Sequence, residues 1–312
     1  MLKKILYVLL ALIFILIGAF VFTYRGDVPV DKLKAKYANQ PSKFITVKGG
    51  EVHYRDEGQG FPLVLIHGTG ASLHTWEVWS KQLSKDFRVI RFDLPAYGLT
   101  GPDPKHDYRI SAYVDFVKQF LDKLAIKKCH IAGNSLGGNI SWQFALNYPD
   151  RVDKMILLDA SGIPTNKKSP WVFRLAKTPV LNKIVRYATP RFFFRNNLKQ
   201  VYSDDSKITE ALVDQYYDLM LREGNREAFL YRVKVKYRDK SGEIKRIKNR
   251  TLIMWGKEDA WIPVKLAHEF NKRLPNSELI IYPNVGHVPM EEIPNKTVAD
   301  ALKFLKTTHK VP

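Results

Sequence analysis

Cysteine is nearly missing from this sequence. Cys129 is the single cysteine among 312 residues, so no disulfide can form within the chain. A chain of this length can bury a core large enough to fold without cross-links, so the lack of disulfides excludes neither a reducing nor an oxidising compartment. Cys129 stands in a strand-like run, and we interpret it as a small buried apolar residue and not as a nucleophile.

Internal repeats and low-complexity tracts are also missing, and acidic residues are few. The chain has 50 Lys and Arg against 31 Asp and Glu, a formal net charge of +19. Such a charge favours anionic partners, namely lipid headgroups, nucleic acid or an acidic substrate. No nucleic-acid-binding module is recognisable, and the glycine-rich segments lack the GK[ST] of a phosphate-binding loop. We therefore expect no nucleic-acid partner.

Charged residues are absent from one long stretch, Ile5 to Thr23. As a helix it would reach roughly 28 Å, close to the bilayer core of about 30 Å. The run is longer than the apolar core of a cleaved signal peptide, and no small-x-small cleavage site follows it. We predict an uncleaved membrane anchor over residues 1–25. A cleaved signal peptide and a buried core helix are the alternatives.

The charges beside this stretch bear on its orientation. Lys3, Lys4 and the terminal amine favour a cytoplasmic N-terminus. Four basic residues between positions 25 and 36 oppose this orientation. We predict that the N-terminus lies inside and that the folded domain lies on the non-cytoplasmic side of the membrane.

Beyond the anchor, strand-like and helical patterns alternate. Residues 26–43 are polar, contain two prolines and are predicted to be a linker. Near-continuous apolar strands that alternate with helices indicate an α/β fold, with a mostly parallel sheet covered on both faces. Residues 44–162 and 249–312 would form its core, and the helical insertion at 163–248 would cap the carboxyl ends of the strands. The strand-like runs are FITV, EVHYRD, PLVLIHG, FRVIRFDLP, KCHIAG, DKMILLDASG, TLIMWG and ELIIYPN.

The segment GNSLGG at 133–138 fits the pattern G-x-S-x-G, between a strand-like run and a helical pattern. In that setting the pattern is typical of a nucleophile elbow. The tight turn strains the backbone of Ser135, and glycines at 133 and 137 avoid side chains that would clash. Amides at the start of the following helix favour developing negative charge. Ser135 is therefore the predicted nucleophile, with an ordinary glycine turn as the alternative.

A serine nucleophile needs a base, and the base needs an orienting acid. Of the eight histidines, His287 ends the run that looks like the last strand, so it can reach back over the sheet edge. Asp259 follows the strand-like run TLIMWG and is the predicted acid. Asp159, which also ends a strand, and Glu258 are its rivals. The resulting order of Ser135, Asp259 and His287 is the one found in α/β-hydrolases.

An oxyanion needs two backbone N–H donors. Leu136, directly after the nucleophile, is predicted to supply one, and Thr69 in IHGTGAS the other. Gly68 and Gly70 let that loop approach closely. His67 is predicted to hold the loop by hydrogen bonding and not to act as a base.

With these motifs in this order, the chain resembles the α/β-hydrolase superfamily from about Phe44 to Leu305. The resemblance implies eight strands, a cap inserted after the sixth, and acyl-enzyme chemistry that needs no metal or organic cofactor. Ala96 is a departure, since such chains often have glycine there. The segments that carry the resemblance are HGTG (67–70), DLPAYGLTGP (93–102), GNSLGG (133–138), YPDRVDKMILLDASG (148–162), WGKEDAWIP (255–263) and GHVPMEEIP (286–294).

The resemblance also bears on the substrate. A serine at 135 argues against relatives similar to haloalkane dehalogenases and epoxide hydrolases, which use a carboxylate. Asn134 with HGTG resembles hydrolases that cleave carbon–carbon bonds in ring-fission products, although esterases and lipases also tolerate that asparagine. The anchor favours esters, because an enzyme of soluble metabolites has little use for a bilayer helix. We predict hydrolysis of amphiphilic or lipid-like esters; a carbon–carbon bond hydrolase and a non-catalytic membrane protein are the alternatives.

The cap sequence is basic and aromatic. Between Ala160 and Ser203 there is no acidic residue, and aromatic residues are interleaved with nine basic ones. This composition favours contact with lipid headgroups, and a solvated basic face is the alternative. The basic residues are Lys167, Lys168, Arg174, Lys177, Lys183, Arg186, Arg191, Arg195 and Lys199.

Overall fold

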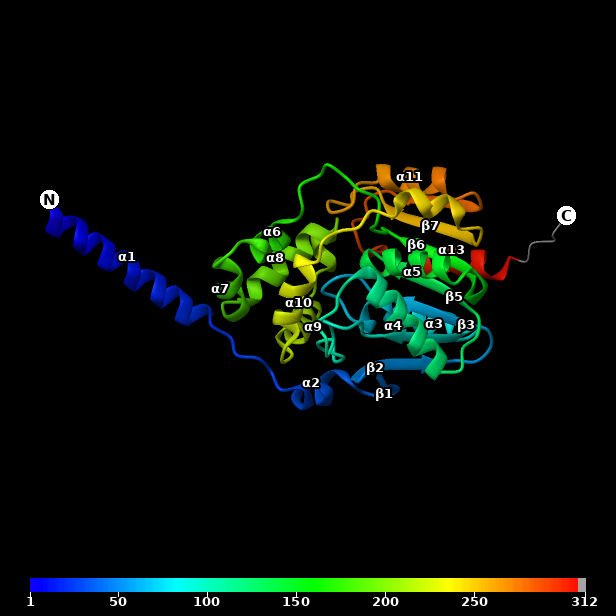
Figure 1. Ribbon diagram of the computed structural model, residues 1–312, viewed down its shortest axis with the longest axis horizontal. Coiled ribbons are helices and arrows are strands. Elements are labelled where there is room, and N and C mark those ends of the chain that lie inside the picture. Colours follow the sequence, from blue (N-terminus) through cyan, green and yellow to red (C-terminus); the bar gives the residue numbers. More distant parts are fainter. Residues whose placement is uncertain (308–312) are drawn as a thin grey trace.

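The computed structural model describes residues 1–307 and has an eight-stranded sheet at its centre (Figure 1). Neighbouring strands follow the order β1-β2-β4-β3-β5-β6-β7-β8. β2 is antiparallel to both β1 and β4, and the remaining pairs are parallel. The predicted mostly parallel sheet is confirmed. The strands are β1 (Ser42–Val47), β2 (Gly50–Glu57), β3 (Pro62–Ile66), β4 (Arg88–Phe92), β5 (Cys129–Asn134), β6 (Val152–Leu158), β7 (Arg250–Gly256) and β8 (Ser277–Tyr282).

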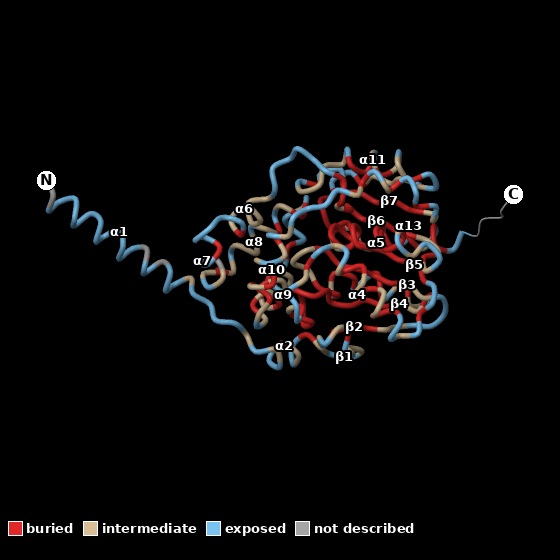
Figure 2. The backbone as a smooth tube through the Cα atoms, viewed as in Figure 1, coloured by how far each residue is buried: buried red, intermediate tan, exposed pale blue. Residues whose placement is uncertain are grey.

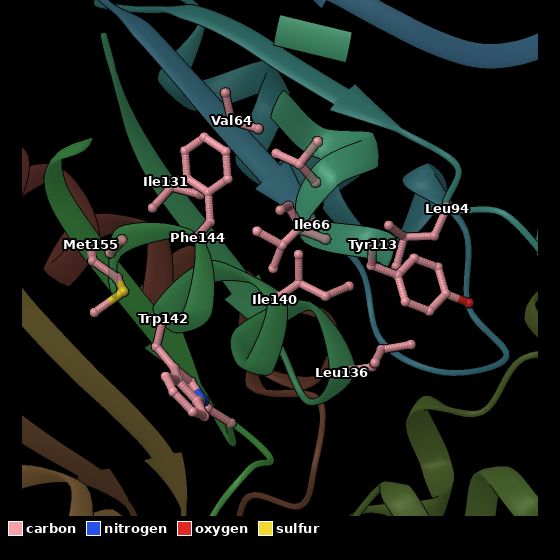
Figure 3. Close-up of a cluster of buried hydrophobic side chains, with 14 of the residues drawn as sticks. Val64, Ile66, Leu94, Tyr113, Ile131, Leu136, Ile140, Trp142, Phe144 and Met155 are labelled. Atoms are coloured by element: carbon pink, nitrogen blue, oxygen red, sulfur yellow. The ribbon is translucent and has the colours of Figure 1, made fainter. Parts of the chain in front are cut away.

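Both faces of this sheet are covered by helices, and β3 shows how. Its side chains alternate, with Val64 and Ile66 in one core cluster and Leu63 and Leu65 in the other (Figure 3 shows the first). All four are fully buried, each adding about 1.5–3 kcal/mol of stability. The buried sheet and its flanking helices make up the core (Figure 2). Helices α4 (Ile110–Lys123), α5 (Leu136–Asn147) and α11 (Lys265–Arg273) contribute to the first cluster, and α3 (Glu77–Leu83) and α13 (Pro294–Lys306) to the second.

Five helices interrupt the alternation between β6 and β7. They fall within residues 163–248, the region expected to form a cap, and lie between α1 and the sheet (Figure 1). This arrangement puts them beside the loops that follow the parallel strands. The cap helices are α6 (Trp171–Lys177), α7 (Leu181–Tyr187), α8 (Arg191–Val201), α9 (Glu210–Leu221) and α10 (Asn225–Lys234).

Helix α1 (Leu2–Thr23) projects away from the rest of the molecule (Figure 1). It is long and apolar enough to cross a membrane, and none of its most apolar window is buried against the protein. Length and composition of this kind fit an anchor or a signal sequence.

The region expected to be a linker holds a short helix, α2 (Val30–Tyr37). Leu33 and Tyr37 on α2 are buried in a small cluster with Leu99 and Leu219. Polar composition and two prolines favoured a linker, but an apolar pair four residues apart lies on one helical face and packs there. The chain is therefore tied to the domain soon after α1 ends.

Candidate active site

Ser135 lies between the end of β5 and the start of α5, as the elbow motif predicted. Its backbone is strained, with φ 53° and ψ −112°. A Cβ at position 133 would meet the Gly137 carbonyl carbon at 2.3 Å, and one at position 137 would meet the Ile66 oxygen at 2.1 Å. Both positions therefore require glycine. The turn raises Ser135 at the start of α5, where the first backbone N–H groups lack partners within the helix.

His287 and Asp259 come from the loops after β8 and β7, and the structure brings them together. Their Nδ1 and Oδ2 atoms are 2.7 Å apart, and both residues are buried. The other carboxylate oxygen of Asp259 accepts hydrogen bonds from the backbone N–H groups of Trp261, at 2.7 Å, and Ile262, at 2.8 Å. These three donors fix the carboxylate, which in turn fixes the imidazole with Nε2 as its free nitrogen.

His287 and Ser135 lie at the same cavity, and the second ring nitrogen of His287 has no partner among the described residues. Nε2 is buried and makes no hydrogen bond within residues 1–307, and both residues line one cavity under the cap. The ring of Trp261 lies against the imidazole, with centroids 5.4 Å apart. Without a bound substrate, the hydrogen bonds of a catalytic group are often long. The arrangement suits proton exchange between Ser135 and His287.

The two rival acids are placed differently. Glu258 is exposed and accepts a hydrogen bond from the Val285 N–H at 3.1 Å. Asp159 is buried, and its Oδ1 accepts from the Gly256 N–H at 3.0 Å. Burial and the neighbouring charge of Asp259 raise the pKa of the Asp159 carboxyl well above its ordinary value, which favours its neutral, protonated form.

Within residues 1–307, a possible ligand atom for a metal ion from each of Asp159, Asp259 and His287 lies within 4.8 Å of the other two. The His287 Nδ1 and Asp259 Oδ2 atoms are already hydrogen-bonded to one another, and the raised pKa of the Asp159 carboxyl favours its neutral form. This donor set fits a hydrogen-bonded acid–base pair better than a cation.

The loop after β3 packs directly on the elbow. A Cβ at Gly68 would lie 2.8 Å from the Asn134 Oδ1 atom and 3.2 Å from the Ser135 Cβ atom. Thr69 lines the cavity beside Ser135, and Leu136 is the first residue of α5. Both predicted oxyanion donors therefore lie next to the predicted nucleophile.

His67 holds this loop, as expected. Its Nε2 accepts a hydrogen bond from the Leu94 N–H at 2.9 Å, so its Nδ1–H donates to the Gly68 carbonyl at 2.7 Å. Burial lowers the pKa of the imidazole, which keeps it neutral.

Sequence reasoning missed Glu292 in α12 (Pro289–Glu292). Its buried carboxylate accepts three backbone hydrogen bonds, from Gly286 at 2.7 Å, Ser203 at 2.9 Å and Asp204 at 2.8 Å. Gly286 directly precedes His287, whose own N–H donates to the Val201 carbonyl at 2.7 Å. The histidine loop is therefore tied to the end of the cap helix α8. The acidic pair after GHVPM was a signal, but spacing alone could not predict three backbone partners.

We expect Glu292→Gln to lower the free energy of unfolding by about 1–3 kcal/mol, because an amide NH₂ would face a backbone donor. Denaturant unfolding followed by circular dichroism measures this change. Glu258→Gln is the matched control, since Glu258 is exposed and accepts a single hydrogen bond in the same region. Equal losses in the two variants would contradict the role given to Glu292.

The cavity above Ser135 is apolar, and most of it comes from the cap. Two arginines, Arg186 and Arg226, line it but are neutralised by Glu227, at 2.9 and 2.8 Å, and by Asp27, at 3.2 and 2.6 Å. An apolar chain is therefore the natural occupant. The sequence did not reveal this lining, which includes Trp171, Phe173, Phe193, Phe194, Met220 and Phe229.

Comparison with known proteins places the chain in a family. Residues 62–294 match the family model described as the alpha/beta hydrolase fold. The chain belongs to this family, as the sequence resemblance implied.

Proteins similar to this chain carry names that state different reactions. The chain is 28% identical over 260 residues to 2-hydroxy-6-oxo-6-phenylhexa-2,4-dienoate hydrolase of Burkholderia cepacia, covering 79% of this chain and 90% of that one. The structure of a meta-cleavage product hydrolase from Pseudomonas fluorescens IP01 is 28% identical, with a TM-score of 0.73 over 84% of this chain and 97% of that chain. The structure of a membrane phospholipase A is 24% identical, with a TM-score of 0.73 over 97% of this chain and 98% of that chain.

Proposed function

We propose that this protein is a membrane-anchored serine hydrolase that cleaves carboxylic esters of amphiphilic, acyl-chain-bearing molecules. The observation that carries the proposal is the apolar cavity beside Ser135, built by the same cap helices that meet the end of α1. An acyl chain in this cavity would bring its ester carbonyl to Ser135.

The proposed reaction uses the groups described above. His287 Nε2 takes the proton of Ser135, whose oxygen attacks the ester carbonyl. The backbone N–H groups of Thr69 and Leu136 stabilise the negative charge on the carbonyl oxygen. The alcohol leaves with the proton from His287, and a water activated by His287 then releases the acid. Asp259 orients the imidazole and stabilises its charged form.

The join between α1 and the cap supports a substrate taken from a membrane. The Tyr24 ring stacks on that of Tyr187 with centroids 6.3 Å apart, and the Arg25 N–H donates to the Tyr187 carbonyl at 2.8 Å. Large apolar side chains around α7 are exposed there. They are those of Val180, Leu181, Tyr187 and Phe192. With α1 in a bilayer, this end of the cap would face the lipid surface.

The basic residues of the cap support the same orientation. Of the nine between 160 and 203, four form ion pairs and five form none with any residue in 1–307. Basic side chains near an anionic lipid surface add about 1 kcal/mol of binding each. The five without an ion pair are Lys167, whose Nζ donates to the Ala260 carbonyl, and Lys168, Arg174, Lys177 and Lys183.

Carbon–carbon bond cleavage is the second candidate. It is favoured by the 28% identity to hydrolases named for dienoate and meta-cleavage substrates. The same serine, histidine and acid would serve that reaction. Ester cleavage is the first candidate because the apolar cavity suits an acyl chain and because α1 suits an enzyme that takes its substrate from a bilayer.

Hydrolysis of two substrate panels in detergent separates the candidates. We expect turnover of p-nitrophenyl esters from acetate to laurate, with a maximum at the longer chains because the cavity is apolar. Dienol-ketone ring-fission products should be cleaved far more slowly. The reverse order would favour the carbon–carbon hydrolase. No turnover on either panel, with no labelling by a fluorophosphonate, would favour a non-catalytic protein.

The anchor has its own test. We expect the full-length protein to stay in the membrane pellet after alkaline carbonate extraction, with an intact mass that still includes α1. A chain without residues 1–23 should move to the supernatant, because it lacks the one helix within residues 1–307 that is long and apolar enough to cross a membrane. Protease protection in spheroplasts would report the side, and we expect the domain outside the cytoplasm. A mature soluble protein that lacks the N-terminal segment would indicate a cleaved signal instead.

A further inference from the structure

A second cavity opens on Ser135. It is lined by Thr69, Ser135 and Leu136, the predicted oxyanion donors and nucleophile, and then runs along α6 and α10. Phe173 and Trp261 border both cavities, and their rings meet edge to face with centroids 5.5 Å apart. The reacting centre thus has two separately lined spaces, which suits a substrate with two different ends.

The second cavity differs from the first in its charge. Lys177, near the end of α6, and Arg232, on α10, line it, and none of its lining residues is acidic. Neither side chain forms a hydrogen bond or an ion pair with any residue that the structure describes, and the Arg232 Nε atom is buried without a partner. The arginines of the first cavity are instead held by Glu227 and Asp27. Ser161, Ser169 and Tyr237 also line the second cavity.

The Arg232 Nε atom is a buried donor without a partner among the described residues, and the exposed Lys177 adds a positive charge to the same cavity. A buried donor without a partner costs stability, and that cost is recovered when an anion accepts from it. Guanidinium groups bind carboxylate and phosphate oxygens with two parallel hydrogen bonds, and an ammonium group adds a second positive charge. The chemistry of the second cavity therefore selects an anion.

We infer that the second cavity binds the alcohol part of the ester and that this part carries a negative charge, so the substrate is an acyl ester of an anionic alcohol. This inference rests on the proposed ester hydrolysis. The acyl chain would lie in the apolar cavity, and its carbonyl at Ser135. The bond between the carbonyl carbon and the alcohol oxygen breaks, the acyl group passes to Ser135, and the anionic alcohol leaves with the His287 proton. A phosphate or a carboxylate on the alcohol would satisfy the same donors.

Matched esters test the inference on the full-length protein in detergent. One pair is p-nitrophenyl octanoate and its analogue with a carboxylate on the nitrophenyl ring. The other is monooctanoylglycerol and monooctanoylglycerol phosphate. The readout is the ratio of kcat/KM for the anionic ester to that for the neutral ester. We expect the wild-type ratio to exceed one in at least one pair, and the pair with the larger ratio identifies the anionic group.

Variants connect that ratio to the cavity. Arg232→Gln should lower the ratio about tenfold or more, and Arg232→Lys should keep part of it, because the charge remains. Lys177→Gln should lower the ratio as well. Because Lys177 is exposed, this substitution should leave the fold intact, so a lower ratio would not reflect misfolding. Lys234→Gln is the matched control. This lysine is exposed on the same helix as Arg232 and outside the cavity, so both rates should match wild type.

The outcomes separate this inference from the proposed function. A wild-type ratio of one or less in both pairs overturns the inference, and so does a ratio that neither Arg232→Gln nor Lys177→Gln changes. In both cases ester hydrolysis itself would stand. Failure of the wild type to cleave any of the four esters would overturn the proposed function instead.

Discussion

Replacing Ser135 with alanine is expected to lower kcat for p-nitrophenyl octanoate by about 10⁶-fold, because no other group can form the acyl-enzyme. The fold should survive, because the Ser135 side chain makes no capping hydrogen bond to α5. The positive φ of this residue strains serine and alanine equally, so the substitution adds no strain. Steady-state kinetics in detergent, with circular dichroism and thermal unfolding as controls, measures both effects.

His287→Ala is expected to lose a similar factor, and the double variant about as much as either single one. The two residues act as one unit, so their effects do not add. Turnover by Ser135→Ala within tenfold of the wild-type rate would contradict the nucleophile assignment. If the fold-loss in kcat of the double variant equalled the product of the two single fold-losses, the pairing of Ser135 with His287 would be contradicted.

The second large effect concerns the acid. Asp259→Asn is expected to lower kcat by about 10⁴-fold, because the amide NH₂ would face the His287 Nδ1–H and favour the wrong tautomer. The 2.7 Å hydrogen bond between Asp259 and His287 is the basis for this expectation. Kinetics across a range of pH, with the same unfolding control, measures it.

Asp159→Asn is the matched comparison. Burial and the charge of Asp259 raise the pKa of Asp159 and so favour its protonated form, and asparagine copies the shape and neutrality of a protonated acid. Its oxygen can still accept from the Gly256 N–H. We expect kcat to stay within about tenfold of wild type. An active Asp259→Asn variant beside an inactive Asp159→Asn variant would reverse the assignment of the acid.

Much of the fold could be predicted from the sequence, because strand periodicity and strand-end motifs are local signals. Each apolar run between turn residues became a strand of the sheet. GNSLGG gave the position of Ser135, since the clashes that require Gly133 and Gly137 arise within one strand, turn and helix. The acid was harder, because Asp159 and Asp259 both end strands. Adjacent parallel strands β6 and β7 bring the two carboxyls together, and the hydrogen bond to His287 identifies Asp259 as the acid.

Features that depend on distant packing could not be predicted. α2 is stabilised by burial of Leu33 and Tyr37 against residues far along the chain, so its polar composition was misleading. The cavity lining depends on how the cap helices pack over the sheet, which helical periodicity does not specify. Glu292 binds backbone groups at 203, 204 and 286, and no sequence pattern records such partners.

The central claim is that Ser135 is the activated nucleophile of an ester hydrolase. The most direct measurement is peptide mapping by mass spectrometry after a brief exposure of the full-length protein to a long-chain fluorophosphonate, with and without p-nitrophenyl octanoate as competitor. The account predicts one adduct, on Ser135, which forms more slowly when the ester is present and is absent from His287→Ala. An adduct on another residue, or none, would contradict it, as would labelling of Ser135 at a rate that the ester does not change.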